Sequence, residues 1–385
     1  MGLAPGTLRP HPLSVNPRPT TLVISNIAWD FVWQRHQTMA SLFARDSDVV
    51  FCELPGIRRV GWRDAGRVLA RLFTLIRRAA SGASLPVGVR LVRPFVLPAT
   101  NGLFHAVNAK LLRRFLRREP ALTAGVDLIL NYTPAHSALQ LLDRVPHRQL
   151  VYDCTDDWLA VRDIPACLPA DERTLLARAD LTLVSSRRLE VLKQPHARRL
   201  ERVPHGALVE RFLVDPRPRP ANGALTVLYY GHLHSQHLDF AAIETLARAR
   251  PAWRVILVGP VKTPQVFSPN VELPGQQPHE RLREFVAQAD VLLLPYAHNE
   301  YTRAVMPAKT YECLATGRPI VATPLPELVE DFSAHLRFAA TPDEWAPAVE
   351  EASRLQTPEA RAAQIELAGR NTWESRYARV RELLA

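Results

Sequence analysis

Residues 292–323, LLLPYAHNEYTRAVMPAKTYECLATGRPIVAT, have the pattern of a strand, a polar loop, a helix and a second strand. Pro307 suits the first turn of the helix, and Gly317 suits the position just after its end. The two strands are continuously apolar, which is typical of a parallel sheet that helices cover on both faces. This stretch therefore predicts an α/β fold.

Two charged side chains in the predicted helix are candidate ligand contacts. Lys309 lies near its start, where an ammonium group adds to the partial positive charge of the helix N-terminus and could face a diphosphate. Glu312 lies one turn further on, beside the small Ala315, where its carboxylate could accept hydrogen bonds from both hydroxyls of a ribose. On spacing alone, an exposed lysine and a surface glutamate remain the alternative.

The alternation of strands and helices extends over most of the chain. A run rich in proline and glycine, VDPRPRPANGA at residues 214–224, interrupts it and predicts an interdomain linker. We therefore expect two Rossmann-like, doubly wound domains, residues 21–213 and 225–372, facing a central cleft. The predicted strands are Thr21–Ile27, Val49–Glu53, Val126–Asn131, Gln149–Asp153, Leu181–Ser185, Leu225–Tyr230, Arg254–Val258, Val291–Pro295 and Ile320–Thr323. The predicted helices include Asp239–Ala249 and His279–Ala289.

Length and composition favour a globular protein of two domains. A chain of 385 residues exceeds the roughly 250–300 residues that one hydrophobic core holds. With 47% hydrophobic and 22% charged residues, the chain is not a collagen, a coiled coil or a largely disordered protein. No run of about 18 uncharged apolar residues occurs, so we expect no membrane span. Residues 1–20 are rich in proline without an apolar signal-peptide core, and we expect a disordered lead.

The cysteines predict neither disulfides nor a metal site. They are Cys52, Cys154, Cys167 and Cys313. No pair has CxxC or other metal-ligand spacing, so we expect reduced, mostly buried thiols in a cytosolic protein.

The positive charge is concentrated in one segment. The chain has 48 basic and 38 acidic residues, a net charge of +10, but residues 57–118 hold 14 basic residues against the single acid Asp64. Two parts of this segment, residues 63–78 and 110–117, combine basic side chains at helical spacing with an apolar face. Such helices can lie on anionic lipid, and ordinary core-facing helices with solvated arginines are the alternative.

An ordered set of residues in the opening stretch carries a family resemblance. From Asn299 to Thr323 the chain follows the pattern NExTRAxxPxKxYExLAxGxPIVxT. With this pattern the second half resembles the donor domain of retaining GT-B glycosyltransferases of family 4, which use nucleotide sugars. Pro204-His205-Gly206 with Glu210-Arg211-Phe212 is similar to that family's passage into the linker, and Asn270–Gly275 to a strand whose following loop meets the base.

The resemblance implies a GT-B fold in which the second domain binds the donor and a closing helix, residues 373–385, crosses back to the first domain. The donor contacts it implies are Gly231, His232, His237, Gly259, Arg303, Pro307, Lys309, Thr310 and Glu312. The sequence departs from the family at Ala304, where the first of two glutamates is expected, and we assign Glu300 as the replacement catalytic carboxylate. The two histidines stand where the family has an arginine and a lysine, which leaves Arg303 and Lys309 as the cations for the diphosphate.

Candidate acceptor contacts lie in the first domain. The assigned residues are Trp33, Arg35, His36, Asn131 and Asp156. The first three belong to an aromatic and basic stretch similar to the family subgroup's WxxRxQ start, with simple ring packing as the alternative. The run VYDCTDDW, residues 151–158, gathers three carboxylates at the end of a strand. We assign Asp157 as the catalytic base, with a role as a helix cap as the alternative.

These features together predict a glycosyltransferase. It would move a sugar from a nucleoside-diphosphate sugar, with UDP- or GDP-sugar favoured, to a glycan or lipid-linked acceptor in the synthesis of cell-surface polysaccharide or glycolipid. We expect retention of configuration, no metal ion, no cofactor, and a cytoplasmic location in which residues 57–118 contact the anionic inner face of the plasma membrane. One alternative is a nucleotide-sugar epimerase of the same fold. A nucleic-acid-binding protein is the other, and the absence of RRM, KH and helix-turn-helix patterns disfavours it, so we expect no nucleic-acid partner.

Overall fold

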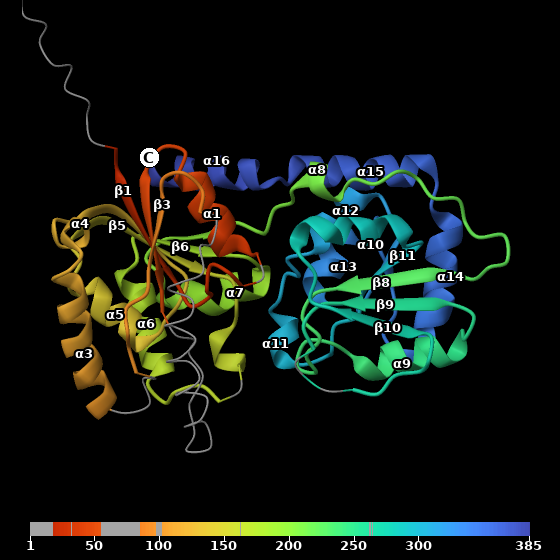
Figure 1. The fold of residues 1–385 in the computed structure, drawn as a ribbon, viewed down its shortest axis with the longest axis horizontal. Helices are drawn as coiled ribbons and strands as arrows, with labels where there is room; N and C mark the ends of the chain where they lie inside the picture. The colour runs from red at the N-terminus through yellow and green to blue at the C-terminus, as the bar shows by residue number, and fades with distance from the viewer. Residues whose placement is uncertain are drawn as a thin grey trace, which may run out of the picture.

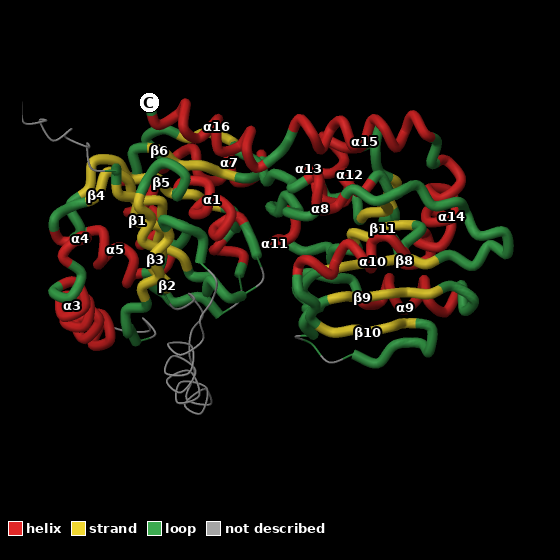
Figure 2. Tube along the Cα trace, turned by 45° about the horizontal axis from the view of Figure 1, so that its top comes forward, coloured by secondary structure: helices red, strands yellow, loops and turns green. Residues whose placement is uncertain are grey.

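The computed structural model describes residues 18–31, 33–54, 85–97, 102–161, 163–261, 263 and 265–385. Two parallel sheets, each covered by helices, form two separate units (Figure 1). In Figures 1 and 2 the helices α15 and α16 run along one side of the molecule, past both units. The predicted α/β fold with two doubly wound domains is confirmed.

The first sheet has seven parallel strands in the order β3-β2-β1-β4-β5-β6-β7. Its strands are β1 (Thr20–Ser25), β2 (Asp48–Glu53), β3 (Val89–Val92), β4 (Val126–Asn131), β5 (His147–Cys154), β6 (Leu181–Val184) and β7 (Leu200–Arg202). Its helices are α1 (Arg35–Phe43), α3 (Gly102–Leu116), α4 (Pro120–Thr123), α5 (His136–Leu142), α6 (Leu168–Arg178) and α7 (Arg187–Lys193), with short 3-10 turns at Trp158–Ala160 and Gln194–His196. The strand order reverses between β1 and β4, where ligands bind in open sheets of this type.

The second sheet has six parallel strands in the order β10-β9-β8-β11-β12-β13. Its strands are β8 (Thr226–Tyr230), β9 (Arg254–Val258), β10 (Val271–Gly275), β11 (Val291–Leu294), β12 (Ile320–Ala322) and β13 (Arg337–Phe338). Its helices are α8 (Val209–Phe212), α9 (Phe240–Ala249), α10 (Leu282–Gln288), α11 (Glu300–Arg303), α12 (Thr310–Thr316), α13 (Pro326–Phe332), α14 (Trp345–Leu355) and α15 (Pro358–Arg370), with 3-10 turns at His279–Arg281 and Pro342–Glu344.

Both sheets are buried on their two faces, which explains why their strands are continuously apolar. In β1, Leu22 and Ile24 belong to one hydrophobic cluster and Val23 to another, because successive side chains of a strand point to opposite faces. In β8, Leu228 and Val227 divide in the same way between two clusters. Each domain therefore has two layers of core, one on each side of its sheet.

The predicted elements are close to those observed, with a few differences. The short strands β3, β7 and β13 were not among the predicted ones, because two to four residues carry little periodicity. The helix expected near Pro307 begins at Thr310. The polar loop before it contains the one-turn helix α11, which Asn299 caps through hydrogen bonds between its side chain and the Thr302 N–H and between the Thr302 hydroxyl and its own N–H.

The chain crosses between the domains twice, and the two crossings lie side by side. Ala207, on the way out, pairs with Thr372, on the way back. A Cβ atom at Gly206 would lie 2.7 Å from the Trp373 nitrogen, so only glycine allows this close approach. Beyond the crossing, α16 (Trp373–Leu384) packs on the first domain, where the Tyr377 ring meets Phe43 edge to face.

Two further contacts join the domains beside the crossings. Ala304, in the second domain, is buried within the hydrophobic cluster of the first, and its carbonyl accepts a hydrogen bond from the Ser186 hydroxyl at 2.7 Å. On α13, the Glu327 carboxylate accepts hydrogen bonds from the backbone N–H groups of Arg187 and Arg188 at the start of α7.

The described part of the basic segment includes α3 but not residues 55–84 or 98–101. The predicted amphipathic helix over residues 63–78 therefore lies outside the described residues, as does most of the predicted disordered lead. On α3, Leu112 and Leu116 are buried in the first-domain core while Lys110, Arg113 and Arg114 are exposed. Within the described ranges, no helix is both long enough and apolar enough to cross a membrane.

Candidate active site

A cavity of about 280 Å³ lies between the two domains. The second domain contributes seven of the predicted donor contacts to its lining: Gly231, His232, His237, Gly259, Pro307, Lys309 and Glu312. The first domain contributes four of the predicted acceptor contacts: Trp33, Arg35, His36 and Asp156. Residues that are up to 340 positions apart in the sequence thus meet in one site, since Trp33 and Trp373 both line it.

Two glycines shape the second-domain wall at the ends of β8 and β9. Gly231 and Gly259 have φ angles of +142° and +145°, a region that residues with a Cβ rarely adopt. A Cβ at Gly231 would lie 2.5 Å from Cε and Nζ of Lys309, and a Cβ at Gly259 would lie 1.7 Å from the Gly231 carbonyl oxygen. The absence of a side chain at Gly231 therefore lets the Lys309 amine lie against the end of β8, and the absence of one at Gly259 lets the two turns approach each other.

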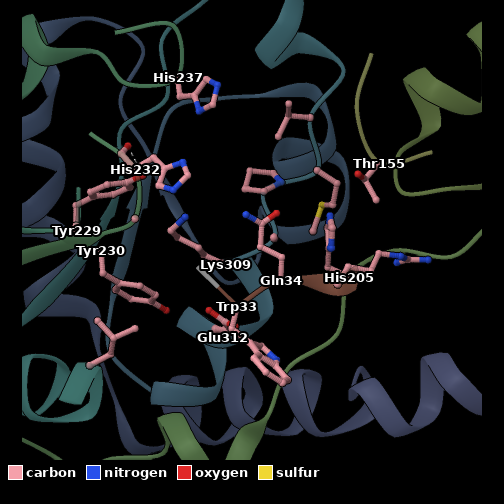
Figure 3. A pocket seen from close by; sticks show the side chains of 18 of the residues that line it. Trp33, Gln34, Thr155, His205, Tyr229, Tyr230, His232, His237, Lys309 and Glu312 are labelled. Atoms are coloured by element: carbon pink, nitrogen blue, oxygen red, sulfur yellow. Dashed lines mark hydrogen bonds between the residues drawn. The ribbon is translucent and has the colours of Figure 1, made fainter. Parts of the chain in front are cut away.

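Lys309 and Glu312 are the charged groups on this wall, placed by the start of α12. The Lys309 amine lies 5.5 Å from the centre of the Tyr229 ring. Figure 3 shows the Lys309 side chain between those of His232 and Glu312. Burial raises the pKa of Glu312 to about 7, an effect that the nearby Lys309 ammonium and a hydrogen bond from Tyr230 partly oppose. A carboxyl group that ionises near neutral pH therefore faces the cavity beside a cation.

Two histidines complete the upper part of the second-domain wall. His232 meets the ring of Phe31, from the first domain, edge to face at 5.2 Å. His237 stacks on the ring of Tyr301 at 5.1 Å with an angle of 13° between the planes. Both histidines therefore line the cavity, and their ring contacts also hold their loop against Phe31 of the first domain and Tyr301 on α11.

In the first domain, Arg35 and His36 have structural partners in addition to their place in the lining. Arg35 is almost fully buried and donates to the Asp153 carboxylate at 2.7 Å and to the carbonyl oxygens of Val203 and Pro204. His36 shares a hydrogen bond with the Ser25 hydroxyl at 2.8 Å, and burial lowers its pKa to about 3. His36 is thus neutral, and Arg35 mainly holds α1 to the crossing segment.

The neighbouring carboxylates Asp156 and Asp157 have different surroundings. Asp156 lines the cavity, where it accepts hydrogen bonds from the Tyr301 hydroxyl at 2.7 Å and the Thr155 hydroxyl at 3.1 Å, and burial raises its pKa. Asp157 accepts a hydrogen bond from the Leu159 N–H and lies 3.6 Å from the Lys193 amine. Asp157, which we assigned as the base, is thus a cap in an ion pair and is not among the residues that line this cavity, and its catalytic role stays a prediction.

Four other predicted site residues lie outside the cavity lining. Glu300 and Arg303 form an ion pair at 3.1 Å on the surface of α11, with 70% and 60% of their side chains exposed. Asn131 is fully buried and exchanges hydrogen bonds with the backbone of Thr133, while Thr310 is buried below the start of α12. In this structure α11 turns the ion pair toward solvent, and the assignments of Glu300 to the sugar and Arg303 to the diphosphate stay predictions.

The cavity also includes residues that were not among our predictions. Among them are Tyr229, Tyr230, His205, Tyr301 and Trp373. The two tyrosines directly precede Gly231 at the end of a predicted strand, which is a signal that could have identified them. His205 and Trp373 lie at the two domain crossings, whose closeness no local pattern reveals. In the described part of the chain, no group of three or more His, Cys, Asp and Glu side chains is arranged to hold a metal ion.

The comparisons with known proteins agree with this geometry. Residues 224–354, which include the glycine turns, Lys309 and Glu312, match the family model described as Glycosyl transferases group 1. Over this segment the chain is therefore similar to group 1 glycosyltransferases. The glycosyltransferase resemblance is thereby confirmed for the donor half, where the predicted motif lies.

One curated relative and several solved structures extend the comparison. Over 236 residues the chain is 29% identical to TuaH of Bacillus subtilis (strain 168), whose name assigns it to teichuronic acid biosynthesis as a glycosyltransferase. The match covers 54% of this chain and 58% of TuaH, so the chain spans less than two thirds of that relative.

The solved structures show the fold of the whole chain. Sucrose-phosphate synthase from Thermosynechococcus elongatus is similar with a TM-score of 0.66 and 15% identity, over 95% of this chain and 98% of its own. Anabaena HepE in complex with UDP and glucose has a TM-score of 0.66 and 14% identity, over 95% and 99%. The trehalose-6-phosphate protein of E. coli bound with UDP-2-fluoro glucose has a TM-score of 0.61 and 15% identity, over 94% and 98%. These likenesses confirm the predicted GT-B architecture.

Proposed function

We propose that this protein transfers a glycosyl group from a nucleoside-diphosphate sugar to a glycan or lipid-linked acceptor in cell-surface polysaccharide synthesis. The observation that carries the proposal is the cavity wall in which Lys309 lies against Gly231 with Glu312 on the same helix. The name of the relative TuaH supports a role in polysaccharide synthesis, and two structural neighbours, bound to UDP and to UDP-2-fluoro glucose, support a uridine nucleotide.

The donor half supplies positive charge where negative charge develops in the reaction. When the bond from the anomeric carbon to the diphosphate oxygen breaks, charge accumulates on that oxygen, and a fixed cation such as Lys309 stabilises it. Glu312, ionised above about pH 7, accepts hydrogen bonds from the ribose hydroxyls. This scheme needs no metal ion and no cofactor, and we propose that the transfer proceeds without either.

The acceptor approaches from the first-domain wall, where Asp156 is the carboxylate of the cavity lining. As an ionised carboxylate, Asp156 accepts a hydrogen bond from the acceptor hydroxyl and orients its oxygen toward the anomeric carbon. We propose attack on the face that the diphosphate leaves, so that the hydroxyl proton passes to the departing diphosphate oxygen and configuration is retained. The anomeric configuration of the product, read from its proton NMR coupling, tests this outcome, and inversion would refute it.

A nucleotide screen tests the donor site directly. We expect UDP, or else GDP, to raise the melting temperature of the wild-type protein more than ADP or TDP, and Lys309→Ala and Glu312→Ala to abolish the increase. Matched controls are Lys110→Ala on α3 and Glu366→Ala on α15, which remove the same charges from exposed positions that are not part of the cavity lining. A nucleotide effect that survives both cavity substitutions would show that the donor binds elsewhere. Release of free sugar and nucleotide at a rate that no glycan or lipid-linked acceptor increases would favour an epimerase instead.

We also propose that the basic segment, residues 57–118, holds the enzyme on the anionic cytoplasmic face of the plasma membrane. The exposed Lys110, Arg113 and Arg114 on α3 support this, since each basic residue near such a surface contributes roughly 1 kcal/mol. The apolar face of α3 is buried in the first domain and cannot enter the lipid, so the contribution of α3 to membrane binding is electrostatic. We expect co-sedimentation with phosphatidylglycerol-containing vesicles and not with pure phosphatidylcholine vesicles. Equal binding to both would refute the electrostatic contact.

A further inference from the structure

One hydrogen bond joins the two walls of the cavity. The hydroxyl of Tyr301, on α11 of the second domain, donates to the carboxylate of Asp156, which follows β5 of the first domain, at 2.7 Å. Both residues line the cavity and are half-buried. The carboxylate that the acceptor meets is therefore held by a group from the opposite domain.

One contact holds the Tyr301 ring, and two others anchor the segment that carries it. The ring stacks on His237. It belongs to a helix whose first turn is closed by Asn299, and the Asn299 amide also donates to the Gln236 carbonyl at 2.9 Å. Three residues further on, Ala304 is buried in the first-domain cluster. Since the segment is anchored in both domains, its hydroxyl reaches Asp156 at a set position.

The groups around Asp156 act on its ionisation in opposite directions. Burial raises the pKa of the carboxyl, and the neighbouring Asp157 raises it further. The hydrogen bonds from Tyr301 and Thr155 lower it. The positive charge of Lys193 is directed to Asp157 and to the buried Glu172, which it contacts at 2.8 Å. Among these neighbours, the hydroxyl groups of Tyr301 and Thr155 are therefore the ones that favour the ionised form of Asp156 directly.

We propose that Tyr301 is a positioning residue that holds the Asp156 carboxylate ionised and oriented for the acceptor hydroxyl, and that it does so only while the two domains are closed on each other. This inference rests on the proposed function. Tyr301 occupies a position that the family pattern leaves open, so its role belongs to this chain's own geometry. An open form would lose the donor and would leave the carboxylate to water, so the Tyr301 contact acts only in the closed form.

The first test measures the carboxyl group itself and needs no substrate. The protein is labelled with ¹³C at the aspartate carboxyl carbons and titrated by NMR, with Asp156→Asn identifying the signal. In Tyr301→Phe we expect the Asp156 midpoint to rise by about one pH unit, since a hydrogen bond to a charged group contributes about 1.5–3 kcal/mol and one unit corresponds to 1.36 kcal/mol. The control Tyr377→Phe removes a hydroxyl that donates to Asp46 on the surface, and should leave the midpoint unchanged.

The second test uses UDP release from UDP-glucose, with water as the acceptor, measured as a function of pH. In Tyr301→Phe we expect the acidic limb of the rate to move up by about one unit while the rate at high pH stays within about threefold of wild type. A merely structural role would instead lower the rate at all pH values without moving the limb. With saturating UDP-glucose, Asp156→Asn should remove the part of the limb that moves in Tyr301→Phe and leave the part that comes from Glu312.

The outcomes separate this inference from the proposed function. If the Asp156 midpoint and the acidic limb are the same in Tyr301→Phe as in wild type, the positioning role is refuted while the donor site stands. If Lys309→Ala and Glu312→Ala leave nucleotide binding intact, the proposed function fails whatever Tyr301 does.

Discussion

Glu327 makes a contact between the two domains whose contribution can be measured. Its carboxylate, with 3% of the side chain exposed, accepts hydrogen bonds from the backbone N–H groups of Arg187 and Arg188 at 2.7 and 3.3 Å. In this way the second domain caps the first turn of α7, a helix of the first domain. The Arg187 guanidinium lies 3.4 Å from Glu327 and also pairs with Glu330 and Asp331 at 3.0 and 2.5 Å.

The substitution Glu327→Ala should destabilise only the form in which the two domains are closed on each other. In the closed form the two N–H groups would be left covered and without an acceptor, whereas in an open form water hydrates them. A cap contributes about 1 kcal/mol and a hydrogen bond to a charged group about 1.5–3 kcal/mol, so we expect closure to weaken by about 2–3 kcal/mol. That corresponds to a shift of about 30- to 150-fold toward open forms.

Small-angle X-ray scattering measures the shift as an increase in the radius of gyration. The matched control is Glu272→Ala, which breaks an exposed ion pair with Arg254 inside the second domain. We expect salt of about 1 M to enlarge the difference, because it also screens the exposed part of the Arg187 cluster. A radius of gyration equal to that of wild type at low and high salt would show that Glu327 does not hold the domains together.

Three further predictions concern the site and its supports. The affinity for UDP should fall as the pH drops below about 7, because Glu312 then gains a proton and can no longer accept both ribose hydrogen bonds, and Glu312→Gln should remove this dependence in a calorimetric titration. Gly259→Ala should lower the free energy of unfolding in urea by about 3 kcal/mol, since the new Cβ would meet the Gly231 carbonyl at 1.7 Å, whereas Gly369→Ala, with open space around it, should not destabilise the chain. Ala304→Glu should lower the same free energy by about 3 kcal/mol, because it places an unpaired carboxylate in the first-domain core, and an unchanged unfolding midpoint would contradict that packing.

The charged pair of the donor wall was predictable because Lys309 and Glu312 lie on one continuous stretch of chain. Lys309 is the N-cap of α12 and Glu312 lies three residues further on, so a strand, a helix start and a glycine stop were enough to place them together. The fold followed from the same source, since continuously apolar strands between helices admit few arrangements other than covered parallel sheets.

The acceptor wall was not predictable to the residue, for a physical reason. Asp156 and Asp157 are neighbours at the end of β5, and which one faces the cavity depends on Lys193, 36 residues further on, which lies beside Asp157. In the same way, Glu300 and Tyr301 are adjacent on a helix of one turn, and the docking of Ala304 on the first domain decides that the tyrosine faces inward. Single-residue rotations of this kind are set by tertiary contacts.

The side-by-side crossings make the first domain discontinuous in sequence. Its core includes Trp373, Val380 and Leu383 from the end of the chain, while Ala207 and Thr372 mark where the second domain leaves and returns. The second domain is thus an insert whose two ends meet at one point. Cutting the chain in the linker at residues 214–224 would therefore separate the first domain from part of its own core, whereas the segment between the crossings could be removed or exchanged as one piece.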